Sequence, residues 1–423
     1  GTLIGAVEKW SMSGCVEVRS LDLDDPSLLR PVLSDLDEMM RFYGMMGYEI
    51  LRIREVLGKG VEELDEGSQL ALLEAGYSRV GSFLAKGRFI PRRFSSGDLL
   101  AYVLWRQGIP KERRSESILD GLSRSGGFRY DYEAYLRCRV KVPLKRLQEQ
   151  GTLVRVQGMP EFLTYTTLEF ARIFRKAKDV RMTEDMRSLV RILEDRGRLS
   201  RDELFSLSPV GQGRSRAALR SLYVGGAVYF DRARRACLVP DTELSREEAR
   251  KEVVRMLFRS YGLFSAEGLA SFIRFRIPMK EVREMLATLE AEGLLVKGYF
   301  NEDDDNLYWM LAEDVGAIGL DFADSFVLTP NDNLHPYLLP IISRRFGRGR
   351  SVIFRGREMI GAFRSRTRGK DLQITEFVGD SEARVVLKEH IRTMGLTLKK
   401  SDGQTMPDWE IQEFYEKTHP GEA

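Results

Sequence analysis

The chain has 423 residues, a net charge of +3, and hydrophobic residues at 43% of its positions. At about 100–200 residues per domain, this length predicts about three domains. The small net charge excludes a histone-like polycation, three distant cysteines exclude a disulfide framework, and three histidines are too few for a multi-histidine metal centre. No segment has the roughly 18 apolar residues of a membrane span, and no signal-peptide pattern opens the chain. We therefore expect a cytoplasmic protein with no cofactor, no metal and no membrane contact.

Residues 1–95 fit no repeated pattern and are assigned no fold. We expect a strand pair at the start, followed by a long methionine-rich helix over residues 33–57. The segment after it carries Arg88, Arg92 and Arg93, interleaved with two phenylalanines. This mixture is typical of sites that hold phosphates together with unstacked bases. A linker whose phenylalanines anchor it to a core explains the same residues equally well.

One pattern occurs three times: two leucines three residues apart, a glycine four residues later, and a short apolar run. The three glycines are Gly151, Gly226 and Gly293. Leucines three apart share one face of a helix, and the glycine falls where a helix end needs the left-handed conformation. The β-prone run after the glycine should open a hairpin. Each copy therefore predicts the second half of a winged helix-turn-helix.

These patterns predict three winged helix-turn-helix units in tandem, over residues 96–180, 181–245 and 246–318. The expected helices are 96–107 and 141–150 in the first unit, 183–196, one from 200 and 214–224 in the second, and 246–260, 265–273 and 280–292 in the third. In the third unit, Ser245 is a helix N-cap with a glutamate three residues later, which is a capping box. The first unit contains an unusually long connection, residues 108–140.

Short β-prone runs separated by turns predict a small β-rich, barrel-like domain over residues 319–400, which a helix over residues 382–395 closes. The tail, residues 401–423, is polar and has no predicted element. The expected fold class is therefore α+β, with tandem winged helix-turn-helix domains followed by a small β-rich domain.

The second winged-helix unit concentrates arginines on the two elements that face DNA in a winged helix. They are Arg214, Arg216 and Arg220 on the expected third helix, and Arg232, Arg234 and Arg235 in the expected wing. Arginine suits this task because its planar guanidinium pairs bidentately with phosphate or guanine. So many like charges repel one another unless an anionic partner is present. We therefore predict nucleic-acid contact here, with a solvated surface or a protein–protein interface as the alternative.

The β-rich domain carries a second basic group. Arg344, Arg345, Arg348 and Arg350 flank a glycine-containing turn, and further arginines follow on the next strands. Alternation along the strands directs several of them to one face, which predicts a second nucleic-acid surface. By contrast, acidic residues 302–305 occupy the wing turn of the third unit and would repel a phosphate backbone. We expect that unit to act as a packing or spacer module.

Catalytic patterns are scarce. The chain has no glycine-rich phosphate-binding loop ending in Lys and Ser or Thr, so no ATPase motor is expected in it. No serine or cysteine has a histidine context that indicates a nucleophile. Asp332 and His335 are close in sequence, but a histidine in such a turn is more often structural. No catalytic residue is assigned, and whether the protein is an enzyme is left open.

The order of these segments over about residues 85–375 resembles the region beyond the motor in Lhr (large helicase-related) DNA helicases. The likeness is carried by residues 96–110, 118–128 and 145–156 and by the repeats after them. The family's Asp-Pro-Leu-Asn element reads Asn331-Asp332-Asn333-Leu334 here, without a proline after the aspartate. The resemblance implies DNA handling beside a helicase motor, whose two domains would lie on another stretch of polypeptide.

The arrangement is also similar to that of AlkZ/YcaQ-type winged-helix DNA glycosylases, which unhook bulky or crosslinked bases. Those enzymes use a Gln-x-Gln or Gln-x-Asp motif, and Gln148-Glu149-Gln150 matches it by letters. These residues end an expected recognition helix, where surface glutamines are the favoured interpretation. The resemblance implies nucleic-acid handling, with glycosylase activity as an alternative.

We therefore predict a DNA-binding module of a DNA repair or helicase system that holds duplex or single-stranded DNA. A DNA glycosylase that removes damaged or crosslinked bases is the first alternative, and a protein-interaction scaffold is the second. The expected partners are DNA and a helicase motor on the same or another polypeptide.

Overall fold

The computed structural model describes residues 7–8, 15–23, 25–45, 48–157, 163–178, 180–273, 277–319 and 321–399. The expected polar tail, residues 401–423, lies outside them. The chain divides into two compact units. The first comprises Gly1–Leu99, Leu263–Ser271 and Ile277–Gly319, and the second comprises Leu100–Gly262, Phe272–Arg276 and Leu320–Ala423. Each unit thus joins segments far apart in sequence. Among the helices in the described ranges, none is long and apolar enough to cross a membrane.

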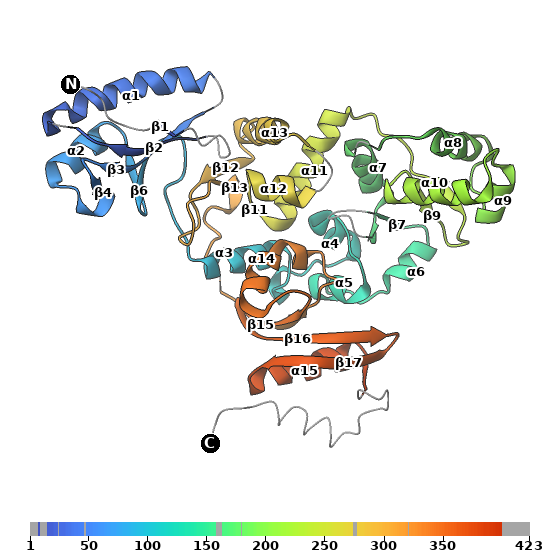
Figure 1. The fold of residues 1–423 in the computed structure, drawn as a ribbon. Coiled ribbons are helices and arrows are strands. Elements are labelled where there is room, and N and C mark those ends of the chain that lie inside the picture. Colours follow the sequence, from blue (N-terminus) through green and yellow to red (C-terminus); the bar gives the residue numbers. More distant parts are fainter. Residues whose placement is uncertain are drawn as a thin grey trace. The chain divides into compact units, whose positions relative to one another are not determined.

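The N-terminal part of the first unit is a six-stranded sheet with two helices (Figure 1). Its elements are β1 (Val7–Glu8), β2 (Cys15–Leu21), α1 (Leu29–Gly44), β3 (Ile50–Val56), β4 (Lys59–Gly60), α2 (Glu66–Glu74), β5 (Ser78–Val80) and β6 (Phe83–Gly87). The strand order is β1-β2-β3-β6-β5, with β4 paired to β3. β2 and β3 run parallel and are connected through α1, while the other pairs are antiparallel.

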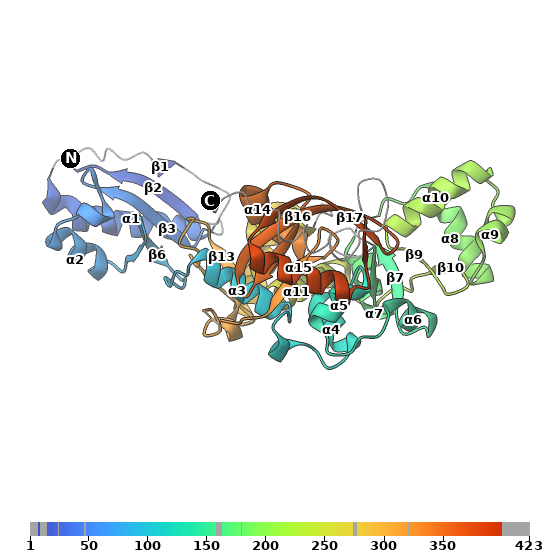
Figure 2. The same ribbon diagram turned by 90° about the horizontal axis from the view of Figure 1, so that it is seen from below.

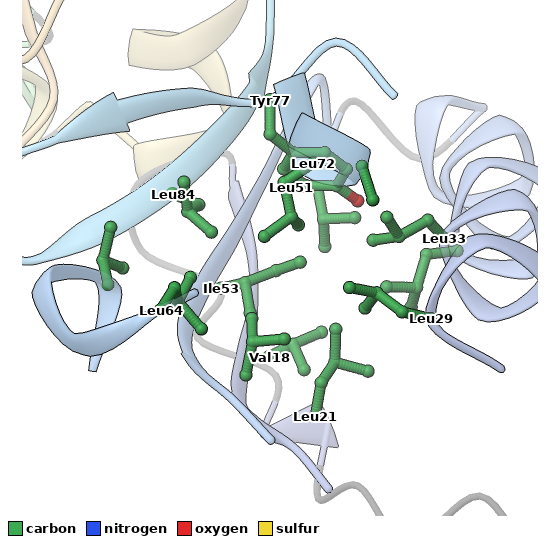
Figure 3. Close-up of a cluster of buried hydrophobic side chains, with 14 of the residues drawn as sticks. Val18, Leu21, Leu29, Leu33, Leu51, Ile53, Leu64, Leu72, Tyr77 and Leu84 are labelled. Atoms are coloured by element: carbon green, nitrogen blue, oxygen red, sulfur yellow. The ribbon is translucent and has the colours of Figure 1, made fainter. Parts of the chain in front are cut away.

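The core of this sheet forms on the face that carries α1 and α2. Leu29, Leu33 and Leu36 lie three or four residues apart on α1, so they share its buried side. They join one buried cluster with Leu51 and Ile53 of β3, as Figure 3 shows for most of these residues. Burying each such side chain contributes about 1.5–3 kcal/mol relative to leaving it exposed. This cluster explains why residues 15–87 fold around one sheet.

The helix expected over residues 33–57 is wrong in its second half. α1 ends at Gly44, and Ile50–Val56 forms the strand β3. A second glycine follows at position 47, and glycines disfavour helix interiors. The isoleucines and valine of β3 are branched residues that favour strands, and its parallel pairing with β2 is a contact that the local pattern does not reveal.

The rest of the first unit contains a three-stranded sheet from the predicted third winged-helix unit. The elements of this stretch are β11 (Leu263–Ser265), α12 (Ala266–Ile273), α13 (Met279–Ala291), β12 (Leu295–Gly298) and β13 (Tyr308–Leu311). The strand order is β11-β13-β12. Gly293 follows α13 with a φ of +75°, the left-handed helix end that the repeat predicts.

The second unit begins with helices around the long connection between residues 108 and 140. The elements are α3 (Ser96–Arg106), which continues from the first unit, α4 (Ile118–Ser125), α5 (Asp131–Arg137), α6 (Leu144–Glu149), β7 (Val154–Gln157), β8 (Leu163–Thr166) and α7 (Leu168–Ala177). β7 and β8 pair as an antiparallel hairpin. The long connection therefore contains two helices, α4 and α5, that the sequence pattern did not predict.

Three helices and a hairpin follow in the order that the sequence predicts. They are α8 (Glu184–Arg196), α9 (Arg201–Leu207), α10 (Gln212–Val224), β9 (Val228–Phe230) and β10 (Ala236–Leu238). Leu189, Leu193, Leu204, Leu219 and Leu222 supply much of their shared core. α11 (Arg246–Tyr261) comes next and begins with the expected capping box, in which the Ser245 and Glu248 side chains bond each other's backbone N–H groups.

The C-terminal part of the second unit is a curled, half-barrel sheet of five strands, in the order β14-β15-β16-β17-β18. Its elements are β14 (Ser325–Leu328), α14 (Leu334–Phe346), β15 (Ser351–Arg355), β16 (Glu358–Arg368), β17 (Asp371–Gly379), α15 (Ser381–Thr393) and β18 (Thr397–Leu398). α15 is the expected closing helix. α14 was not expected, because the sequence pattern predicted only short β-prone runs before the closing helix. It contains Pro340 in its interior, a residue that normally breaks helices. The mixed α+β class is confirmed.

Candidate nucleic-acid interface

A basic cleft lies in the second unit, where α6, β7, α9, α10 and the β9–β10 turn meet. β7 lies beside β9, and α10 contacts both (Figures 1 and 2). The cleft has a volume of about 540 Å³. Five cationic side chains line it: Lys145, Arg155, Arg201, Arg232 and Arg234. Within the described part of the chain none of the five has a carboxylate partner. The cleft therefore presents unneutralised positive charge on a concave surface.

Two of these arginines, Arg232 and Arg234, are exposed in the β9–β10 turn. Asp231 accepts hydrogen bonds from the backbone N–H of Arg235 and from its side-chain Nε, each at 2.9 Å. Although burial raises the pKa of Asp231, these bonds and the Arg235 charge lower it overall. Arg234 takes a left-handed φ of +59°, which is uncommon for a residue with a side chain. Arg235 is therefore bonded to Asp231 within the turn, while Arg232 and Arg234 are exposed at its tip.

The α10 arginines separate into two kinds. Arg214 binds both carboxylate oxygens of Asp185, with Nη2–Oδ1 at 2.6 Å and Nε–Oδ2 at 2.8 Å. Arg216 and Arg220 lie four residues apart, so they share an exposed face of α10, and neither has a partner among the described residues. They do not line the cleft. Of the six arginines expected at this interface, the structure brings Arg232 and Arg234 into the cleft.

The sequence interpretation missed the other three cations of the cleft: Lys145, Arg155 and Arg201. A signal existed for Arg155, because it lies between the buried Val154 and Val156 on a strand and must point to the opposite face. No comparable signal marks Arg201, which directly follows the helix cap Ser200. Its proximity to the β9–β10 turn is a tertiary contact.

Arg93, in the first unit, does not lie on an open surface. Its guanidinium donates to the backbone carbonyls of Asn301, Glu302 and Asp304, and only 13% of the side chain is exposed. Phe94 is buried, and the guanidinium of Arg92 lies 4.8 Å from its ring centre. These contacts match the alternative in which phenylalanines anchor this segment. Arg88 is exposed.

Most carboxylates of the acidic turn, residues 302–305, are bonded within the first unit. Asp305 Oδ2 lies 3.2 Å from Arg54 Nη1 and 3.8 Å from Arg52 Nη2. Ser96 Oγ donates to Asp303, and Asp304 accepts from the Tyr308 hydroxyl at 2.8 Å. Three of the four carboxylates of this turn therefore have internal partners.

The arginines of the β-rich sheet are divided between ion pairs and solvent. Arg350 and Arg364 both bind Glu376, at 2.6 and 2.9 Å. Arg344, Arg345 and Arg348 are exposed. Among those expected on the next strands, Arg366 and Arg368 are exposed near the β16–β17 turn. These five arginines are thus exposed, whereas Arg350 is paired with Glu376.

Asp332 lies inside the second unit and has no access to the cleft. Arg137 binds it through two hydrogen bonds, and both side chains are almost fully buried. Glu133 is also buried and accepts the backbone N–H groups of Arg129 and Asn333. Burial, together with the charge of Asp332, raises the pKa of Glu133. With every carboxylate oxygen of this cluster bonded, the Asp332 element serves as a structural connection.

The Gln148-Glu149-Gln150 segment ends α6, and its first two residues line the cleft. Gln148 Nε2 donates to the backbone carbonyl of Phe230 at 3.3 Å. Glu149 is exposed and has no ion-pair partner among the described residues. The segment therefore brings one amide and one carboxylate to the cleft. Among the described residues, no group of three or more His, Cys, Asp or Glu side chains is arranged to hold a metal ion.

The fold and the cleft define a mixed α+β protein with a concave surface suited to an anionic polymer. Residues 144–335 match the family model described as DNA glycosylase AlkZ-like. This range includes α6, β7, α9, α10 and the β9–β10 hairpin, so the whole cleft lies within the matched residues. The matches do not show the expected relation to Lhr helicases.

The structure is similar to that of the Streptomyces sahachiroi DNA glycosylase AlkZ. The TM-score is 0.55 at 15% sequence identity, and the match covers 72% of this chain and 98% of that one. At this identity the likeness shows a shared fold. No curated protein matches the chain.

Proposed function

We propose that this protein binds DNA through the basic cleft and acts in DNA repair. The observation that carries the proposal is the set of five cationic side chains without carboxylate partners, which four separate elements bring to one cleft. Like charges this close repel one another, and an anionic partner removes that repulsion. The AlkZ-like sequence of residues 144–335 supports DNA as this partner.

The winged-helix interpretation supports the same part of the chain and adds the exposed face of α10 to the cleft. In a winged helix, the third helix and the hairpin both approach the duplex. α8, α9 and α10 followed by the β9–β10 hairpin have this order, and Arg216, Arg220, Arg232 and Arg234 lie on those two elements. We therefore infer that residues 181–245 form the main DNA-contacting unit. The exposed arginines of the β-rich sheet would form a second, weaker contact.

DNA glycosylase activity is the second candidate. Hydrolysis of a glycosidic bond needs a carboxylate or amide that activates water or stabilises the sugar cation. Gln148 and Glu149 supply these groups at the edge of the cleft, in a region that matches the AlkZ-like family. Glu149 is the group we assign to this role, because it is a carboxylate among cations.

Binding measured against salt tests the first proposal. Each neutralised phosphate gives a slope of about −0.9 in a plot of log affinity against log salt. We expect a slope steeper than −3 on duplex DNA, and a flat response would favour a protein-interaction scaffold. Alkylated or crosslinked duplex, incubated with the protein and then treated with alkali, tests the second. Strand breaks that Glu149→Gln abolishes would support it, and an absence of breaks above background would exclude it for those lesions.

A further inference from the structure

Two aromatic rings form part of the wall of the cleft. Tyr223, from the end of α10, and Phe230, from β9, are both partly exposed. Their ring centres lie 5.3 Å apart with planes inclined at 56°. The Arg201 guanidinium lies 4.7 Å from the centre of the Phe230 ring. The cleft therefore offers ring surface as well as positive charge.

Arg155 is the least satisfied cation of this wall. It is half-buried, and its Nε atom is buried without a hydrogen-bond acceptor. Its guanidinium lies 5.1 Å from the centre of the Tyr165 ring and has no ion-pair partner among the described residues. A buried donor without an acceptor destabilises the free protein. Because Arg155 also lines the cleft, an anionic ligand there would be an ion-pair partner for its guanidinium.

The Tyr223 hydroxyl is close to the same charges. Burial raises the pKa of Tyr223, while the charges of Arg155 and Arg201 act in the opposite direction. No hydrogen bond from this hydroxyl occurs within the described ranges. The ring, its hydroxyl and two guanidinium groups are thus available to one ligand at the same place.

We propose that the cleft receives a single unpaired nucleotide of a DNA strand. This inference rests on the DNA-binding function proposed above and adds the form of DNA that is bound. The base stacks on Tyr223 and contacts Phe230, whose ring is inclined to that of Tyr223, and Arg155 and Arg201 bind its flanking phosphates. A base inside a duplex exposes only its edges, because its faces are covered by its neighbours. Aromatic rings therefore recognise a base that has left the stack. The volume of about 540 Å³ lies within the usual range for ligand sites.

The test compares a fully paired duplex with the same duplex carrying one central bulged nucleotide, with 2-aminopurine as the bulged base. We expect the bulged duplex to bind about tenfold more tightly, the order of one stacked base. We also expect the 2-aminopurine fluorescence to fall on binding, because stacking quenches it. RNA of the same sequence serves as a comparison, and tighter binding of bulged RNA would overturn the assignment to DNA.

Three variants locate the effect: Tyr223→Leu, Phe230→Leu and Arg155→Gln. The two leucine variants should lose most of the preference for the bulge and the fluorescence change, while paired-duplex binding keeps its salt dependence. Arg155→Gln should weaken binding of the bulged duplex more than that of the paired one. Arg191→Ala is the matched control, because Arg191 is exposed on α8 outside the cleft. Thermal melting of each variant establishes that it is folded.

The outcomes separate this inference from the proposed function. Equal affinity for both duplexes, with unchanged fluorescence, overturns the inference and leaves salt-dependent DNA binding standing. A bulge preference that survives in both leucine variants also overturns it. Absence of binding to every DNA at low salt would overturn the proposed function and this inference together.

Discussion

Arg137 donates hydrogen bonds to both carboxylate oxygens of Asp332, with Nη2–Oδ1 at 2.7 Å and Nη1–Oδ2 at 3.0 Å, and both side chains are almost fully buried. The two residues lie 195 positions apart, so this pair ties α5 to the turn before α14. Arg137 also donates to the side chain of Gln107 at 3.0 Å. Because both side chains are buried, removing either one leaves the other charge buried without a partner.

We predict that Arg137→Met destabilises the protein by about 3–5 kcal/mol, because it leaves the Asp332 charge buried without a partner. Urea denaturation measures the loss. The exposed pair Arg139–Glu116 is the control, and Arg139→Met should cost no more than about 1 kcal/mol. Equal costs for the two variants would mean that burial does not determine the contribution of the pair.

Stability should fall as the pH drops from about 6.5 toward 4, partly because of His390. Burial lowers the pKa of His390 to about 4, and its Nδ1 has no hydrogen-bond partner. The unfolded chain takes up a proton near pH 6.5 and the folded chain does not, so acid favours unfolding by up to about 3 kcal/mol. His390→Phe removes this proton uptake. Plots of melting temperature against pH for the two proteins, from pH 7 to pH 4, should therefore converge or cross. Parallel plots would contradict the role of His390.

Arg234→Gly should separate stability from binding. Glycine adopts the left-handed φ of this position without steric cost, so the free energy of unfolding should change by less than about 1 kcal/mol. The same change removes one cation from the cleft and should reduce the salt slope of DNA binding by about 0.9. Melting and salt-dependent binding isotherms check the two halves. An unchanged slope would place the DNA away from the hairpin tip.

The outer face of α10 provides a further comparison. Arg216→Ala with Arg220→Ala should weaken duplex binding and reduce the salt slope by about 1.8, if this helix approaches the duplex as in a winged helix. Arg214→Ala should have less effect on binding, because Arg214 is already paired with Asp185. Binding isotherms at two ionic strengths distinguish these cases. A larger effect of Arg214→Ala would indicate that DNA displaces Asp185.

The errors of the sequence interpretation share one cause. Arg93 and Asn301 are 208 residues apart, and nothing local to either shows that a guanidinium and a carbonyl will meet. The same holds for the strand Ile50–Val56, whose parallel partner is β2. Methionine content and spacing favoured a helix there, but parallel pairing with β2 makes these residues a strand. α14 likewise lies where the local pattern predicted only β-prone runs and turns, and its buried residues Leu338 and Ile342 stabilise it through packing.

The sequence by itself determined the features that depend on neighbours within one or two helical turns. These are the capping box at Ser245, the left-handed glycines after α10 and α13, the leucine faces of the helices and the concentration of arginine between residues 214 and 235. Only the tertiary structure decided which arginines are neutralised and which share a cleft. Ion pairs and concave surfaces join segments through space, and long-range burial sets their energies.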